Sequence, residues 1–135
     1  MIEPIAFAAA FLIIDQWSKR LALARKSRQY LSLSPFLRIR AAPRVGPTWR
    51  NSTRASLVLL WLTALACAAL LHHSGWFHDR TALLGVALAF GGAAGNLLDI
   101  LRYRYIVDFI EIPRWWVFNL ADVAIVLGLT AALLA

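Results

Sequence analysis

Charged residues and cysteine are both scarce in this chain. Of its 135 residues, 61% are hydrophobic and only 16% are Asp, Glu, Lys or Arg. A soluble domain carries about 25% charged residues, so the composition favours a small membrane protein. The single cysteine, Cys67, excludes an intramolecular disulfide, and it lies in an apolar block outside any recognisable metal-binding motif. We expect it to be a small, buried hydrophobic side chain.

The charges that are present are mostly positive. The formal net charge is +7, and the basic residues gather between apolar segments. A nucleic-acid partner would be indicated by basic residues interleaved with a recognition motif, and the sequence has no such motif. The anionic headgroups of membrane lipids are therefore the favoured partner, with no nucleic acid.

Long hydrophobic runs divide the chain. A helix that crosses a membrane needs about 20 mostly apolar residues. Four segments approach that length: 2–23, 55–71, 81–98 and 117–135. We therefore predict an all-α membrane protein, with residues 1–135 forming a single integral membrane domain and a bundle of four transmembrane helices. The first run does not have the pattern of a cleaved signal peptide, because its charges follow the apolar stretch.

The segment between the first two predicted spans, residues 24–54, has a different composition. From Arg25 to Arg54 it contains eight basic residues and three prolines among short apolar pieces. This mixture predicts a small surface domain with short strands at the membrane surface, although helix is a second possibility. The connection His72–Arg80 carries all three histidines without a persuasive metal-ligand spacing, and we expect an interfacial loop.

Glycines are concentrated in the third predicted span. Gly91 and Gly95 have the spacing that lets helix backbones approach closely in lipid. A phosphate-binding loop is a poor alternative, because no lysine follows in the required place. We therefore expect these glycines to serve helix packing.

Four acidic residues, Asp15, Asp99, Asp108 and Asp122, lie in or beside the predicted spans. An acid within a span costs roughly 2.5–3.5 kcal/mol on insertion scales, so each needs a structural or functional reason. Asp15 and Lys19 are four residues apart, which places them on one helix face in the favourable order for an ion pair. The pair either neutralises a helix end or grips a substrate.

Two Asn-x-x-Asp units, Asn96 to Asp99 and Asn119 to Asp122, flank the segment that contains Asp108. Helical spacing places each Asn beside its own Asp, where the amide can donate a hydrogen bond to the carboxylate. Asp122 could equally be a capping acid at the start of the fourth helix.

Carboxylates brought together in a partly dry site repel when both are ionised, so one keeps a proton while the other stays charged. Such a pair can deprotonate water and protonate a departing amine, which is the chemistry of an aspartic peptidase. No competing constellation stands out in the sequence. The serines lack His and acid partners in one region, and no helix carries a His-Glu zinc motif.

Four stretches in the right order resemble the signal peptidase II family. The family's elements are Asp-Gln-x-Ser/Thr-Lys, Gly-Gly-Ala-x-Gly-Asn-x-x-Asp, Val-Val-Asp-Phe and Phe-Asn-x-Ala-Asp. Their counterparts here are Asp15-Gln-Trp-Ser-Lys19, Gly91-Gly-Ala-Ala-Gly-Asn-Leu-Leu-Asp99, Tyr105-Ile-Val-Asp108-Phe109 and Phe118-Asn-Leu-Ala-Asp122. Any one of these matches would be weak, but the four together are specific.

The resemblance implies an intramembrane aspartic endopeptidase with Asp108 and Asp122 as its catalytic pair. The residues expected to orient this pair or to bind the substrate are Asp15, Lys19, Asn96, Asp99 and Asn119. The implied reaction removes the signal peptide from a bacterial prolipoprotein, just before a cysteine that already carries diacylglycerol. It implies no metal and no cofactor.

The resemblance also implies a location. We expect a multi-pass protein of the bacterial cytoplasmic (inner) membrane, acting as a monomer, with the active site near the outer face. A lipidated cysteine is anchored at the membrane surface, so a dyad at the ends of the third and fourth helices would meet the scissile bond at the right depth.

The chain departs from the family's pattern at three places. Ile100 stands where the family usually has Arg, with Arg102 or Arg104 as the nearest replacement. The family's Asn-x-Gly-Ala-Ala-Phe element has only a poor counterpart at residues 41–46. The segment 108–122 is shorter than is usual, so a covering flap could be truncated.

The basic loops favour the opposite membrane orientation, because the positive-inside rule would place them in the cytoplasm. We keep the family topology and expect the basic loop to lie against anionic lipid. The alternative function is a catalytically altered paralogue that acts as a membrane scaffold or lipid-binding protein. A proton-relaying transporter subunit is disfavoured, because the acids crowd at one membrane boundary.

Overall fold

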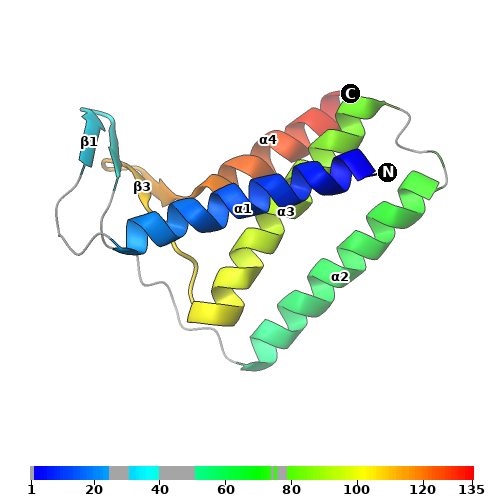
Figure 1. Cartoon of the computed structure of the whole chain (residues 1–135), viewed down its shortest axis with the longest axis horizontal. Coiled ribbons are helices and arrows are strands. Elements are labelled where there is room, and N and C mark those ends of the chain that lie inside the picture. Colours follow the sequence, from blue (N-terminus) through cyan, green and yellow to red (C-terminus); the bar gives the residue numbers. More distant parts are fainter. Residues whose placement is uncertain (1, 25–30, 40–50, 74, 76–78) are drawn as a thin grey trace.

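The computed structural model describes residues 2–24, 31–39, 51–73, 75 and 79–135 (Figure 1). The described part of the chain is mostly helical, with a small antiparallel sheet at one end. Its helices are α1 (Ile2–Ala24), α2 (Asn51–His73), α3 (Arg80–Tyr103) and α4 (Leu120–Leu134). Its strands are β1 (Leu31–Ser34), β2 (Leu37–Ile39), β3 (Ile110–Ile112) and β4 (Trp116–Phe118).

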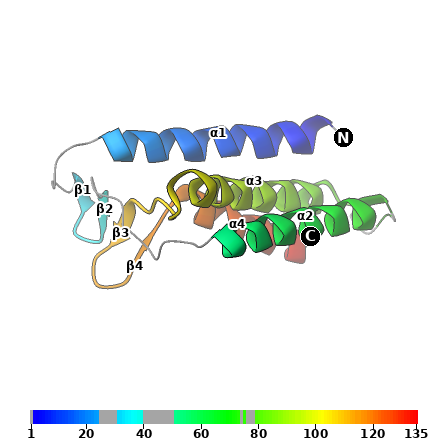
Figure 2. The same cartoon turned by 90° about the horizontal axis from the view of Figure 1, so that it is seen from below.

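Helix α3 is the centre of the bundle, because it contacts each of the other three helices. Helices α3 and α4 lie side by side, α1 crosses over them, and α2 lies along the edge (Figures 1 and 2). The strands gather at the end of the bundle where α1 ends and α4 begins. This end is where the predicted site residues are expected to meet.

The predicted role of the glycines in helix packing is confirmed. A Cβ atom on Gly85 would lie 2.6 Å from the carbonyl oxygen of Gly128 in α4, and one on Gly92 would lie 2.6 Å from that of Ala121. A Cβ atom on Gly91 would lie 2.7 Å from the carbonyl oxygen of Ala8 in α1. The backbone of α3 therefore touches those of two neighbouring helices, which only glycine permits.

The sheet is built from two separate loops, with strand order β1-β2-β3-β4. Ile39 of β2 pairs with Ile110 of β3, and Ile110 pairs with Phe118 of β4. The prediction of short strands between the first two helices is confirmed for β1 and β2, but it missed the second hairpin. The signal for this hairpin is present in the segment 108–122, because its Ile-Glu-Ile and Trp-Val-Phe runs are typical of strands.

The fourth helix begins later than the predicted span 117–135, because Val117 and Phe118 belong to β4 and Asn119 is the helix N-cap. The predicted surface loop 24–54 and the connection His72–Arg80 are described only in part, and residues 41–46 lie outside the described residues.

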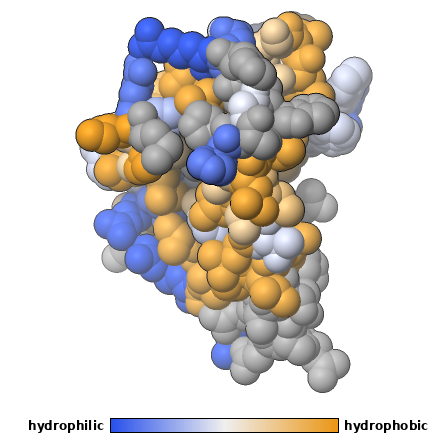
Figure 3. Space-filling view, turned by 90° about the vertical axis from the view of Figure 1, so that its right-hand side faces the viewer, coloured by the Kyte–Doolittle hydropathy of each residue, from blue (hydrophilic) through white to orange (hydrophobic). Residues whose placement is uncertain are grey.

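The bundle buries charge and exposes apolar side chains. Asp15, Lys19 and Asp99 are among its most buried side chains, while large apolar residues of every helix are exposed. The face drawn in Figure 3 is accordingly dominated by hydrophobic residues. Cys67 is exposed on α2, so its predicted burial is wrong. Most of its described neighbours on α2 are exposed as well.

By length and composition, α3 is the described helix that qualifies as a candidate membrane span. Leu57–Leu71 and Leu120–Leu134 are shorter apolar helices. The described helices 2–24 and 51–73 lie close to the first two predicted spans. The number of membrane crossings stays a prediction.

Candidate active site

The two predicted catalytic acids lie where the helix bundle meets the sheet. Asp108 is in the segment that connects α3 to β3, and Asp122 is in the first turn of α4. Both side chains are half-buried, so each combines protein contacts with access from outside. Asn119 joins them, because its Nδ2 donates to Asp108 Oδ1 at 2.8 Å and its Oδ1 accepts from Asp122 N at 3.0 Å.

Asp122 completes a capping box at the start of α4. Its Oδ2 accepts from the backbone N of Asn119 at 3.1 Å, so the predicted capping role is confirmed. Its other oxygen, Oδ1, accepts from Asn96 Nδ2 at 2.8 Å. Both carboxylate oxygens of Asp122 therefore receive a hydrogen bond, which fixes the orientation of this side chain.

The two asparagines have partners that differ from the predicted ones. Asn96 was expected to bond Asp99, but its Nδ2 donates to Asp122 on the neighbouring helix. Asn119 was expected to donate to Asp122, but its Nδ2 donates to Asp108 and to Asn96 Oδ1, the latter at 3.1 Å. Spacing along one helix cannot predict these bonds, because they depend on how closely α3 and α4 pack.

The surroundings of Asp108 favour its protonated form. Burial raises the pKa of this carboxyl to about 6, and the nearby charge of Asp122 acts in the same direction. The hydrogen bond from Asn119 and the charge of Lys19 oppose the shift, while Asp99 adds to it. Asp108 therefore keeps its proton up to about pH 6, next to a carboxylate that receives a hydrogen bond on each oxygen.

A buried ion cluster lies behind the two acids. Lys19 Nζ is 2.8 Å from Asp15 Oδ2 and 2.7 Å from Asp99 Oδ2, and all three residues are at most 1% exposed. The predicted ion pair within α1 is confirmed, and Asp99 of α3 joins it. This burial favours the neutralised ion pair over a role in gripping a substrate.

The cluster also contacts Asn96 and the first turn of α4. Lys19 donates to Asn96 Oδ1 at 3.1 Å, which leaves Asn96 Nδ2 to face Asp122. Asp15 Oδ1 accepts from Ala121 N at 2.9 Å, which satisfies one of the free N–H groups in the first turn of α4. All five predicted supporting residues thus belong to one network with the two acids.

Gln16 and Gly95 were not among the predicted site residues. Gln16 Nε2 donates to Asp99 Oδ1 at 3.0 Å and to the carbonyl oxygen of Gly95 at 3.1 Å. The signal for Gln16 was present in the sequence, as the second residue of the Asp15-Gln-Trp-Ser-Lys19 element. The role of Gly95 becomes visible only once α1 is placed against α3.

We expect Gly95→Ala to lower stability by about 1–3 kcal/mol, as overpacking does. The new Cβ would lie 2.5 Å from Asp15 Oδ2, and this carboxylate cannot move because Lys19 and Ala121 hold it. The gain in helix propensity, about 0.5–1 kcal/mol, is smaller. Thermal unfolding in detergent measures the change, and an unaltered melting temperature would show that α1 can move away from α3.

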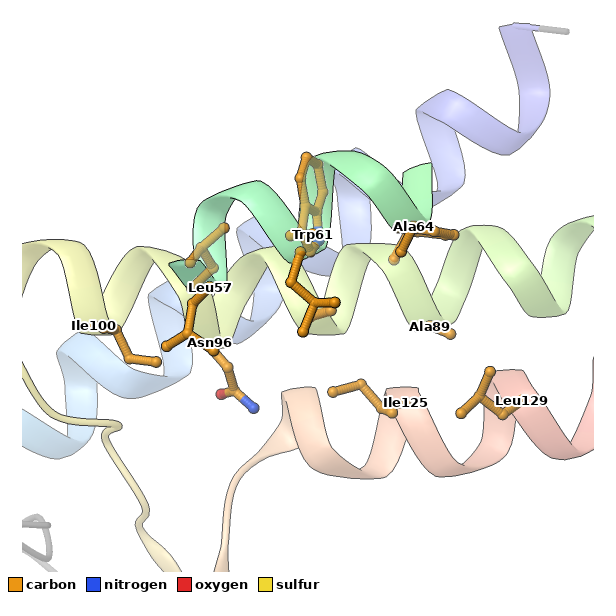
Figure 4. Close-up of a pocket in the computed structure, with 12 residues that line it drawn as sticks. Leu57, Trp61, Ala64, Ala89, Asn96, Ile100, Ile125 and Leu129 are labelled. Carbon is orange, nitrogen blue, oxygen red and sulfur yellow. The ribbon is translucent and has the colours of Figure 1, made fainter. Parts of the chain in front are cut away.

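An apolar cavity of about 390 Å³ lies between α2, α3 and α4 (Figure 4). Asn96 is its one amide side chain, and Ile100 and Ile125 form part of its wall near Asn96. The family's usual Arg is therefore replaced here by an apolar wall residue. Neither suggested substitute lines the cavity among the described residues: Arg102 lies over the ring of Tyr103 and Arg104 is exposed.

Metal binding has no support among the described residues. No group of three or more His, Cys, Asp or Glu side chains in that part of the chain is arranged to hold a metal ion. His72 and His78 are among the residues whose side chains are not described.

Solved structures share this fold. One, described as a bacterial membrane enzyme at 1.9 Å resolution, matches with a TM-score of 0.82 and 22% identity over 99% of this chain and 92% of that chain. A second bacterial membrane enzyme, at 2.3 Å resolution, also gives a TM-score of 0.82, with 21% identity over 99% of this chain and 87% of that chain.

Curated relatives carry one shared name, lipoprotein signal peptidase. The protein of Nitrobacter hamburgensis is 35% identical over 96% of this chain and 88% of its own length. That of a Methylobacterium species is 32% identical over 98% of this chain and 87% of its own length. That of Moorella thermoacetica is 59% identical over a shorter stretch, 37% of this chain and 34% of its own length.

Fold, site and relatives together define the class of protein: an integral membrane peptidase. Residues 7–135 match the family described as signal peptidase (SPase) II. The chain belongs to the signal peptidase II family, and the resemblance seen in its four sequence elements is confirmed.

Proposed function

We propose that this protein is an intramembrane aspartic endopeptidase that removes the signal peptide from diacylglyceryl-modified bacterial prolipoproteins. Asp108 and Asp122 are its catalytic residues. The observation that carries the proposal is the pair of half-buried carboxyl groups linked through Asn119: Asp122 receives a hydrogen bond on each oxygen, and the pKa of Asp108 is raised to about 6. The shared name of its relatives supports the substrate class.

The chemistry follows from the different environments of the two acids. Asp122, ionised, takes a proton from water as the water oxygen bonds to the scissile carbonyl carbon. Asp108, protonated, gives its proton to the carbonyl oxygen, so a neutral tetrahedral diol forms. Asp108 then takes a proton back from the diol and Asp122 gives its proton to the departing amine, while the carbon–nitrogen bond breaks. The steps need no cofactor.

The surroundings of the dyad suit a lipidated substrate. The apolar cavity includes Asn96, which bonds Asp122, so hydrocarbon bound there would lie next to the dyad. Ile100 keeps this wall apolar. Trp115 and Trp116 are 82% and 78% exposed at the turn of the second hairpin, as expected of aromatic residues at a lipid headgroup interface.

The proposal includes a membrane arrangement. The four helices cross the bacterial inner membrane, and the sheet lies at its outer face, with the basic loop against anionic headgroups. The chain acts as a monomer, because the site draws on α1, α3, α4 and the connecting segment of one chain.

The test is cleavage of a diacylglyceryl-modified prolipoprotein by the purified protein in detergent. Mass spectrometry should find the new N-terminus at the lipidated cysteine, and the unmodified precursor serves as the control substrate. A scaffold or lipid-binding paralogue would bind the lipidated precursor and leave it intact. Intact precursor, under conditions where a related lipoprotein signal peptidase cleaves it, would contradict the proposal.

We expect the pH profile of kcat/KM to be bell-shaped. Activity falls as the pH rises through the pKa of Asp108, about 6, because this group must carry a proton. It falls again in acid, when both members of the dyad become protonated. Initial rates measured from acidic to alkaline pH, with chemistry limiting, give the profile. A rate that stays flat across this range would contradict the shared-proton mechanism.

A further inference from the structure

The backbone around Asp108 is held by a hydrogen bond on each side. Phe109 N donates to the carbonyl oxygen of Phe118 at 3.2 Å, as part of the second hairpin. Val107 N donates to Asp99 Oδ2 at 3.1 Å, and Val107 is fully buried. The second bond is to a side chain of α3, so the place of Asp108 depends on how the carboxylate of Asp99 is oriented.

The carboxylate of Asp99 is in turn oriented from α1. Lys19 Nζ lies 2.7 Å from Oδ2, the same oxygen that receives the Val107 amide. Gln16 Nε2 donates to the other oxygen, Oδ1, at 3.0 Å. Gln16 and Lys19 together hold the Asp99 carboxylate with Oδ2 toward the Val107 amide. Its Nε2 also donates to the carbonyl oxygen of Gly95, which fixes the amide against α3.

We propose that Gln16 is a positioning residue for the peptidase reaction, acting through Asp99 and the Val107 amide to hold Asp108 in place. This inference rests on the proposed function. Gln16 is half-buried on α1, whereas Asp108 precedes β3 and Asp122 lies in α4. Its contribution is geometric, and displacements of about 1 Å in an active site can lower the rate about 100-fold.

The predicted consequence is a loss in kcat rather than in substrate binding. In Gln16→Leu the side chain keeps its approximate volume but loses the hydrogen bond that it donates to Asp99. Helix α1 then no longer holds residues 107–109 in place through this bond. We expect kcat to fall about 10- to 100-fold and KM to change less than twofold. Gln16→Glu should lower kcat at least as much, because it places a carboxylate against that of Asp99.

The matched control is Ser18→Ala. Ser18 lies on the same turn of α1, and its Oγ donates to the carbonyl oxygen of Asp15 at 2.8 Å within the helix. Within the described part of the chain its side chain makes no hydrogen bond to α3 or to either dyad acid. Its removal should therefore leave kcat, KM and the pH profile unchanged.

The pH profile separates a positioning role from a purely structural one. Asp122 and Asp99 raise the pKa of Asp108 and Lys19 lowers it, with burial the largest influence. A released segment moves Asp108 toward solvent and away from Asp122, and both changes lower its pKa. The alkaline limb of kcat/KM should therefore shift to lower pH in Gln16→Leu, whereas a smaller folded fraction would only scale the profile.

The outcomes are distinguishable. A lower kcat in both Gln16 variants, with the shifted limb in Gln16→Leu, at an unchanged melting temperature and with Ser18→Ala at the wild-type rate, supports the inference. Wild-type kcat in either variant, or a Gln16→Leu profile that is scaled without being shifted, overturns it. If the wild-type protein does not cleave the lipidated precursor, or if cleavage survives Asp108→Asn, the proposed function itself is overturned.

Discussion

Asp108→Asn and Asp122→Asn each lower kcat by about 10²- to 10⁴-fold, the largest effect expected of any substitution in this chain. The magnitude is that of general acid–base catalysis, and each change removes one of its two participants. An amide at position 108 cannot supply the proton that the raised pKa of the carboxyl retains up to about pH 6. An amide at position 122 cannot accept the proton of the attacking water.

The measurement is single-turnover cleavage of the lipidated precursor, with melting temperatures recorded for each variant. Asp79→Asn is the matched control, because Asp79 is exposed at the start of α3 and its side chain makes no capping hydrogen bond. It makes the same chemical change far along α3 from the dyad and should leave cleavage unaltered. Turnover above a tenth of the wild-type rate in either dyad variant, with the fold intact, would remove that acid from the mechanism.

Asp122→Asn has a second effect that must be kept apart from catalysis. The carboxylate caps α4 by accepting from Asn119 N, and loss of a cap costs about 0.5–2 kcal/mol. The amide retains one acceptor oxygen, so the expected loss is at the low end. Catalysis should therefore fail while the helix stays formed, which a small shift in melting temperature would verify.

Local patterns carried the predictions that succeeded. The ion pair of Asp15 and Lys19 follows from a spacing of four on one helix, and the cap at Asp122 follows from its place three residues after Asn119. The strands β1 and β2 follow from apolar pieces separated by a Pro-containing turn. Each of these features is decided within a few residues of chain.

Contacts between helices could not be predicted in the same way. The partners of Asn96 and of Gln16 depend on the distances between α1, α3 and α4, which are set by glycine contacts along the whole length of α3. The three-way cluster around Lys19 needs Asp99, which is 80 residues away in the sequence. The pairing of β2 with β3 could not be predicted either, because the two strands come from different loops.

Lys19→Met is expected to give the largest loss of stability, about 3–5 kcal/mol, the range for breaking a buried ion pair by removing one partner. Methionine fills much of the space of the lysine side chain but leaves the carboxylates of Asp15 and Asp99 buried without a cation. It also removes a donor to Asn96, which positions Asp122. Thermal unfolding in detergent measures the loss, and Arg20→Met, at an exposed position of the same helix, serves as the control.

A second substitution tests the cause of this loss. If the destabilisation arises from uncompensated negative charge, Asp99→Asn introduced into Lys19→Met should recover part of it, because the amide oxygen can still accept from Val107 N. The two changes would then be strongly non-additive, as expected of residues in direct contact. Losses that simply add would mean that the cluster contributes through packing, and that the bundle does not need a cation between its two buried acids.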